Sequence, residues 1–344
     1  PAQTDDDYPQ KLVSGLLYTG DGSTTQAQTG LGFQPDWTFI KLTASGGSPA
    51  AASWKVFDST RGVTNFLGFN STDAQAAGSD TLKAFGTDGF SVGSNAGTGA
   101  SSDTYTSWNW RANGGTTSSN TEGSITSTVQ ADPSGGFSIS TYTGTGSAAT
   151  IGHGLSSAPT FVIVRRYDSG EAWAVYAKGK GATFYAYLQS NNAFGDDPMW
   201  NDTAPTSTVV SIGTNGETST SGGNYLMYCF ANIEGYCKSG AYIGNGSTDG
   251  SFVYTGFKPA VVIIKRVTGA ESWFIADNKR DPFNVVERFF QLNGSGGESL
   301  ADYDGFDMVS NGFKLRINDV GFNHAESYVY LAWAENPFQY ATAR

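Results

Sequence analysis

The sequence predicts an all-β protein made of three tandem antiparallel sandwiches, and three observations lead to that prediction. Charged residues make up only 15% of the 344 positions, well below the usual quarter. Aromatic residues reach 14% and glycine occupies 45 positions, a balance that suits pleated, half-buried strands joined by tight turns. A set of short motifs recurs three times along the chain, so the strands belong to a repeated unit.

Each copy of the repeat opens with a tyrosine that is followed by a Gly-x-Gly turn. These tyrosines are Tyr18, Tyr142 and Tyr242. A proline lies 17 positions after each of them and opens a hydrophobic strand, at Pro35, Pro159 and Pro259. The strand ends in a cation, at Lys41, Arg165 and Lys265. Because the offsets are equal in all three copies, these are matched positions.

A tryptophan strand comes next in each copy, and an aromatic run with a period of two closes it. The tryptophans are Trp54, Trp173 and Trp273, and the closing runs are 105–110, 225–230 and 328–333. A period of two predicts a strand with one face on a core. Since a shared core requires the same residue at matched positions, we predict that the three tryptophans are buried. The alternative is that they stack on sugars or on the nearby cations.

These motifs divide the chain into five segments: an acidic tail (1–10), a first repeat (11–113), a Ser/Thr/Gly-rich linker (114–134), a second repeat (135–236) and a third repeat (237–344). Within the linker, 124–129 has the composition of one extra strand. The second and third repeats are joined by a short connection, which predicts that they pack together. Six or more strands per repeat predict an antiparallel sandwich or jelly roll, with helix below about a tenth of the residues.

The formal net charge of −11 argues against a nucleic-acid or anionic-membrane partner, because phosphate binding needs clustered Lys and Arg. No run approaches the roughly 18 apolar residues of a membrane span, and residues 1–10 are polar and acidic, unlike a signal peptide. We therefore expect a soluble product without membrane insertion. Cys229 and Cys237 are expected to be buried thiols, because nothing else indicates a disulfide framework.

Catalytic motifs are scarce in this sequence. A retaining glycosidase needs two carboxylates about 5–5.5 Å apart, and no run of alternating acidic residues supplies them. The histidines are His153 and His324, and His153 is expected to be a turn residue. Their spacing suits no metal cluster, and the Gly-rich turns lack the helix and lysine of a phosphate-binding loop. We expect no catalytic residue, no metal and no cofactor.

Two aspartates, each four positions after a repeated tryptophan, precede an arginine by three positions. The expected ion pairs are Asp58–Arg61 and Asp277–Arg280. The second repeat has Ala177 and Lys180 at the comparable places. Such a pair is therefore not essential to the fold.

The best candidate for a binding loop is residues 194–202, where carboxylates surround an aromatic ring that suits stacking on a sugar. The candidate glycan-binding residues are Asp196, Asp197, Trp200, Asn201 and Asp202. The same loop is a candidate for calcium, although it lacks the spacing of an EF-hand. The alternative is that Trp200 is a core residue, since it precedes the strand at 209–212 much as Leu82 precedes Val92.

Several longer motifs are distinctive: Gly152-His153-Gly154-Leu155, Glu234-Gly235-Tyr236, and the segments 240–246, 310–315 and 334–338. Over nearly the whole chain, they resemble tandem-repeat virion structural and fibre proteins of tailed bacteriophages, marine ones especially. The resemblance implies a concanavalin-A-like lectin/glucanase sandwich in each repeat. Fibre proteins of this kind often carry an amino-terminal anchor, whereas here the first repeat begins within 20 residues, so we expect attachment through a repeat face or through Asp5 to Asp7.

The expected function is that of a bacteriophage virion structural protein, in a tail fibre, a head fibre or a capsid decoration. It would be made in the bacterial cytoplasm and exposed on the exterior of the virion. Its expected partners are other virion proteins, further copies of itself as a homo-oligomer, and a host-surface glycan. The alternative is a polysaccharide depolymerase, a glycoside hydrolase on a lectin-like sandwich.

Overall fold

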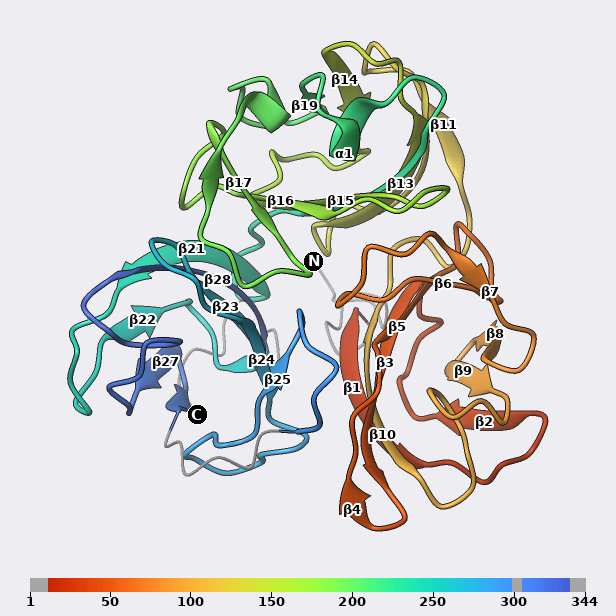
Figure 1. The fold of residues 1–344 in the computed structure, drawn as a ribbon, viewed down its shortest axis with the longest axis vertical. Coiled ribbons are helices and arrows are strands. Elements are labelled where there is room, and N and C mark those ends of the chain that lie inside the picture. Colours follow the sequence, from red (N-terminus) through yellow and green to blue (C-terminus); the bar gives the residue numbers. More distant parts are fainter. Residues whose placement is uncertain (1–11, 299–304, 335–344) are drawn as a thin grey trace, which may run out of the picture.

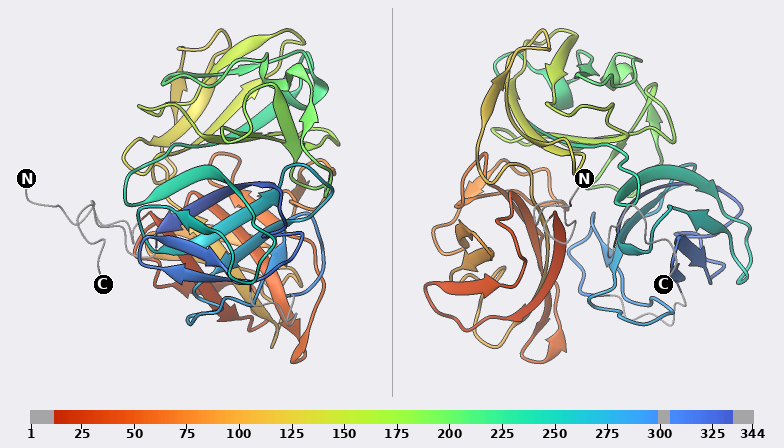
Figure 2. Two further views of the ribbon diagram at one scale, coloured as in Figure 1. Left: turned by 90° about the vertical axis from the view of Figure 1, so that its left-hand side faces the viewer. Right: turned by 180° about the vertical axis from the view of Figure 1, so that it is seen from behind.

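The computed structural model describes residues 12–298 and 305–334, which form three lobes around a common centre (Figure 1). The view from behind in Figure 2 shows the same arrangement. We call them the first lobe (12–113), the second lobe (114–236) and the third lobe (237–298 and 305–334). The regular structure of these residues is strand apart from one α-helical turn, α1 (Gly216–Ser219), and one 3-10 turn, η3 (Pro198–Trp200). The prediction of an all-β fold is confirmed. The predicted acidic tail (1–10) and residues 335–344 lie outside the described residues.

The first lobe has a larger inner sheet, which faces the centre, and a smaller outer sheet. The inner sheet has the order β1 (Val13–Thr19), β10 (Thr104–Trp110), β3 (Trp37–Ser45) and β4 (Ser48–Pro49), and β3 also pairs with β5 (Lys55–Asp58). The outer sheet has the order β2 (Gln26–Thr29), β9 (Gly89–Val92) and β8 (Leu82–Gly86). A separate pair is β6 (Asn65–Phe66) with β7 (Ala76–Ala77).

The second lobe extends its inner sheet to eight strands. Their order is β11 (Ser118–Asn120), β12 (Ser127–Asp132), β13 (Phe137–Thr143), β20 (Asn224–Phe230), β15 (Phe161–Arg166), β16 (Trp173–Ala177), β17 (Phe184–Tyr187) and β18 (Gly195–Asp196). The outer pair is β14 (Ala149–Gly152) with β19 (Val209–Ile212).

The third lobe resembles the first in its strand order. Its inner sheet is β21 (Cys237–Ile243), β28 (Ser327–Ala334), β23 (Pro259–Arg266), β24 (Trp273–Asp277) and β25 (Phe290–Gln291). Its outer sheet is β22 (Phe252–Tyr254), β27 (Gly312–Leu315) and β26 (Phe306–Val309). Neighbouring strands in all of these sheets run antiparallel, as the hairpin-rich sequence predicts.

The segment expected to be a linker, 114–134, is part of the second lobe. It contains two strands, and β12 pairs with β13 from Thr128 to Asp132. The side-chain amide of Gln130 donates to the hydroxyls of Ser59 (2.9 Å) and Thr60 (2.7 Å) in the first lobe. The expectation of a linker is therefore corrected. Its Ser- and Thr-rich composition suits an edge of a sheet as well as it suits a mobile connection.

The three inner sheets use the same register between the first strand of each repeat and its closing strand. The residues opposite one another are Val13 and Trp110, Phe137 and Phe230, and Cys237 and Trp333. Five residues further along, each lobe has a stacked tyrosine pair with ring centroids 5.0–5.2 Å apart: Tyr18–Tyr105, Tyr142–Tyr225 and Tyr242–Tyr328. Matched motifs of the sequence thus occupy matched places in the three lobes.

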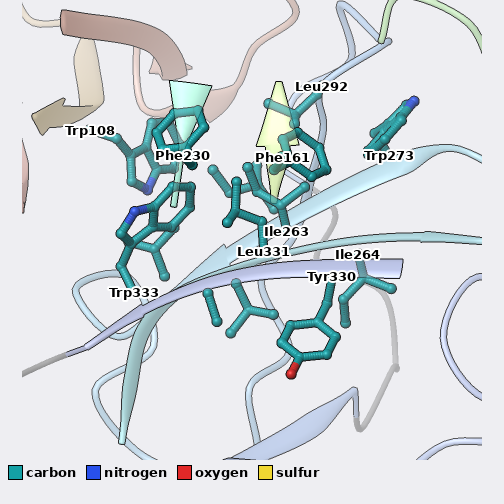
Figure 3. Packing of buried hydrophobic residues seen from close by; sticks show 14 of the residues in the cluster. Trp108, Phe161, Phe230, Ile263, Ile264, Trp273, Leu292, Tyr330, Leu331 and Trp333 are labelled. Atoms are coloured by element: carbon teal, nitrogen blue, oxygen red, sulfur yellow. The ribbon is translucent and has the colours of Figure 1, made fainter. Parts of the chain in front are cut away.

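A continuous aromatic core fills the centre, where the three inner sheets meet. The ring centroids of Trp110 and Trp333 are 4.9 Å apart, and those of Phe230 and Trp333 are 5.4 Å apart, so the last inner residues of all three lobes gather there. Figure 3 shows Trp333 and Phe230 on one side of β28 and Tyr330 on the other. Both faces of this strand are buried, one in the sandwich and one between lobes.

Candidate functional site

The predicted binding loop does not present its aromatic ring to solvent. Trp200, at the end of η3, is 1% exposed and packs edge-on against Tyr176, with ring centroids 5.9 Å apart. The polar members of the loop are exposed or half-buried: Asp196, Asp197, Asn201 and Asp202. The prediction that Trp200 is a core residue is confirmed, and the candidate role of its ring in stacking on a sugar is corrected, because the ring belongs to the core of the second sandwich.

The calcium alternative for this loop also lacks support. Within 12–298 and 305–334, no group of three or more His, Cys, Asp or Glu side chains is arranged to hold a metal ion. Asp197 is 3.5 Å from the side-chain amide of Asn215. Asn201 and Asp202 have φ angles of 50° and 48°, which tighten the turn after η3. The loop is therefore a tight turn over a buried tryptophan.

The three repeated tryptophans are buried, as predicted, and each joins its own lobe to another. Their exposed fractions are 0%, 0% and 1% for Trp54, Trp173 and Trp273. The indole nitrogens donate to backbone carbonyls of the neighbouring lobe: Trp54 to Gln291 (3.1 Å), Trp173 to Gly68 (2.9 Å) and Trp273 to Tyr187 (3.0 Å). The first lobe thus contacts the third, the third contacts the second, and the second contacts the first, which closes a ring.

The three acceptors occupy equivalent places. In each case the acceptor comes directly after the residue that pairs with the position two residues beyond the tryptophan. Those pairs are Val56 with Leu67, Val175 with Ala186 and Ile275 with Phe290. The same cyclic contact is therefore made three times within one chain. This is the geometry of a heterologous ring interface, here closed between parts of a single polypeptide.

The repeated cations are buried in the same junctions. Lys41, Arg165 and Lys265 are 0% exposed. Across the junctions, Lys41 Nζ donates to the Ser295 carbonyl (3.0 Å), Arg165 Nη2 to that of Asp73 (2.5 Å) and Lys265 Nζ to that of Asn191 (3.3 Å). Lys41 also lies 5.3 Å from the ring centre of Trp54. The cation–aromatic contact is therefore internal and is not a ligand site.

Burial of these lysines predicts a pH-dependent stability. Desolvation lowers the pKa of Lys41 and of Lys265 from 10.5 to about 8. Between pH 8 and 10 the unfolded lysines then bind more protons than the folded ones, so each lysine should raise the free energy of unfolding with pH, by up to about 3 kcal/mol. Burial acts in the opposite direction on the thiols and tyrosines: it raises the pKa of Cys229 and Cys237 above the usual range and that of Tyr105 to about 12, so their unfolded forms ionise first. The lysine contribution is therefore the difference between the wild type and a variant that lacks both lysines.

Urea unfolding at pH 7.5, 8.5 and 9.5 measures this slope. The double variant Lys41→Met/Lys265→Met is the control, and the free energy of unfolding of the wild type should increase relative to that of the variant as pH rises over this range. A difference between the two proteins that stays constant between pH 8 and 10 would contradict the assignment.

Both predicted ion pairs are present and buried. Arg61 Nε lies 2.6 Å from Asp58 Oδ2, and Arg280 Nε lies 2.6 Å from Asp277 Oδ2. The hydroxyl of Tyr228, in the second lobe, donates to Asp58 Oδ2 at 3.0 Å. Both carboxylates are therefore engaged in structural contacts.

The remaining reactive groups are also structural in their contacts. His153 is buried, its Nδ1 accepts from the Leu155 amide at 3.1 Å, and desolvation lowers its pKa, so the predicted turn role is confirmed. Cys229 and Cys237 are buried free thiols, as predicted, and burial raises the pKa of both well above the usual range. Neither thiol has the lowered pKa that a nucleophile needs.

One exposed feature, an aromatic pair on the outer sheet of the third lobe, was not among the candidate sites that the sequence indicates. Phe252 and Tyr254 on β22 are 47% and 58% exposed, whereas Val253 between them is buried. The signal that would have found them is the comparison of copies, because the matched strands of the other lobes carry no aromatic residue there.

These observations define a class, an all-β protein whose three lobes are joined by a shared aromatic core. The chain belongs to the family described as a domain of unknown function (DUF7483), whose model matches residues 8–337. That match spans all three lobes and is not confined to one sandwich. A search of curated proteins finds no match. Among the described residues, no helix has the length and apolar character needed to cross a membrane.

Proposed function

We propose that this protein is an external structural protein of a bacteriophage virion, in a fibre or a capsid decoration, and that it acts through its surface and not through catalysis. The observation that carries the proposal is the closed ring of three sandwiches. Its cross-lobe hydrogen bonds and shared aromatic core favour a stiff body whose outer sheets and loops are left for contact. The phage assignment itself rests on the resemblance carried by motifs such as Gly152-His153-Gly154-Leu155 and Glu234-Gly235-Tyr236.

The proposed partners are other virion proteins, further copies of the chain and a host-surface glycan. The inner sheets are already buried within one chain, so contacts with other molecules have to use the outer sheets, loops and free edges. A homo-oligomer would strengthen overall binding to a glycan surface even if each single contact is weak, because repetition raises the effective concentration of each site. Symmetric assembly also suits a particle built from rings and fibres.

Mass spectrometry of purified particles, together with immunogold labelling, tests this proposal. We expect the chain among the structural proteins of the particle and the label on its exterior. Size-exclusion chromatography with light scattering should give a mass that is a multiple of the chain mass. A chain that is absent from particles would refute the virion role, and a monomer would refute the homo-oligomer.

The alternative, a polysaccharide depolymerase, is tested by incubating the protein with host polysaccharide and measuring reducing ends. We expect no release above that of heat-denatured protein. Sustained release that is abolished by a single Asp or Glu substitution would overturn the non-catalytic proposal.

A further inference from the structure

We propose that the outer face of β22 in the third lobe binds a glycan, whose sugar rings stack on Phe252 and Tyr254. This inference deepens the proposed function and rests on its surface-contacting part, because it names the site and the class of ligand. The pair stands on alternate positions of one short strand, so both rings lie on the same face, about 7 Å apart along the strand.

Each ring contacts the protein over part of its surface, and each side chain is about half exposed. Phe252 lies over Gly312, since a Cβ atom built on that glycine would be 3.1 Å from two carbons of the phenyl ring. The Lys238 ammonium is 4.8 Å from the ring centre of Tyr254 and donates to the Tyr254 carbonyl at 3.0 Å. These contacts restrict the two rings, which lowers the entropy lost when a ligand stacks on them.

Polar groups flank the aromatic pair, and they favour a sugar over an apolar protein surface. Lys314 lies opposite Phe252 on β27, and its Nζ is 2.7 Å from Asp249 Oδ1. The Asp249 side chain is 85% exposed, and its hydrogen bond with Lys314 lowers its pKa, so it is ionised at neutral pH. An amine and a carboxylate beside two ring faces offer the donor and the acceptor that sugar hydroxyls require.

The fold itself does not require these aromatic residues. In the first lobe, Gly89 and Ser91 on β9 take the places of Gly312 and Lys314, and the residues opposite them are Thr29 and Ala27. In the second lobe the matched residues are Gly152 and Thr150. Small residues therefore occupy the matched strand positions in two of the three lobes, so the fold does not depend on aromatic rings there. The aromatic pair of the third lobe has a role beyond the core.

In the second lobe, this face is partly covered by the segment that precedes β12. There, the amide of Ser124 donates to Thr150 Oγ1 at 2.9 Å, and Ile125 bridges to Ile151. In the third lobe the matched residues Phe252 and Tyr254 remain exposed to solvent. In the first lobe the matched residues Ala27 and Thr29 are exposed as well, so what is specific to the third lobe is an exposed face that carries aromatic rings.

The test is a bacterial glycan array probed with the full chain and with the double variant Phe252→Ala/Tyr254→Thr, which copies the first lobe. We expect the wild type to bind at least one glycan, and the variant to bind it about tenfold more weakly or worse, a loss of about 1.4 kcal/mol. The matched control is Phe283→Ala, which removes another exposed aromatic ring of the third lobe, 82% exposed, and should leave binding unchanged.

The unfolding midpoint of each variant is measured alongside, and all should match the wild type because the replaced rings are exposed. A wild type that binds none of the glycans, or a double variant that binds as well as the wild type, would overturn the inference. A chain that binds a glycan through β22 but is absent from virions would refute the proposed function and leave this site standing.

Discussion

Replacing Trp54, Trp173 or Trp273 by alanine should lower the free energy of unfolding by about 3–5 kcal/mol, the largest effect we expect from any single substitution. Each ring is fully buried, and each leaves a cavity at a junction that two lobes share. Trp173, for example, packs against Phe69 of the first lobe with ring centroids 5.3 Å apart. The loss should therefore destabilise two lobes at once.

Guanidinium unfolding followed by far-UV circular dichroism measures the loss of stability. The shape of the unfolding curve tests whether the three lobes form one closed, cooperative unit. We expect one cooperative transition for the wild type, because the lobes share one core. The control is Trp173→Phe, which keeps most of the apolar ring but removes the hydrogen bond to the Gly68 carbonyl, and should cost less than alanine. Alanine variants that lose less than about 1 kcal/mol would refute the structural role of these residues.

Removing Asp58 should be nearly as damaging, at about 3–5 kcal/mol for Asp58→Ala. The Arg61 side chain is 3% exposed, so the substitution leaves a buried cation without its carboxylate. It also removes the acceptor of the Tyr228 hydroxyl, which is a contact between the first and second lobes. An unpaired charge in a low-dielectric site costs more than the lost contact itself.

The second lobe supplies a matched control for this prediction. The double variant Asp58→Ala/Arg61→Lys copies Ala177 and Lys180, and Lys180 places its ammonium 3.6 Å from the ring centre of Phe184. We expect the double variant to recover part of the loss, because a flexible lysine reaches solvent or a ring more readily than a fixed guanidinium. Costs that simply add, measured by urea unfolding, would contradict the argument that the unpaired charge dominates.

The fold class and much of the core could be predicted from the sequence, because they depend on local patterns. The period of two in the closing runs predicts β10, β20 and β28, and the recurrence of one tryptophan per copy predicts burial. The Asp58–Arg61 and Asp277–Arg280 pairs were also predictable, since a spacing of three residues in a turn brings the side chains together. Each of these features involves residues that are close in sequence.

Features that depend on long-range packing were not predictable. The composition of 114–134 suggests a linker, but the segment pairs with β13 and bonds to the first lobe through Gln130. For Trp200 the sequence left two interpretations open, a ring exposed among carboxylates and a core residue, and only the packing onto Tyr176 decides for the second. A sequence pattern gives the polarity of neighbours along the chain, whereas exposure depends on what another element places over them.

The sequence by itself determined the all-β class, the burial of the repeated tryptophans and the local ion pairs. The tertiary structure decided that the inner sheets pack against one another, and that Trp54 donates to Gln291, 237 positions away. It also decided that Phe252 and Tyr254 remain exposed on one lobe only. The reason is physical: the period of a strand says which residues share a face, but both faces of β10, β20 and β28 are buried, and which neighbour covers each face is fixed by how the lobes dock.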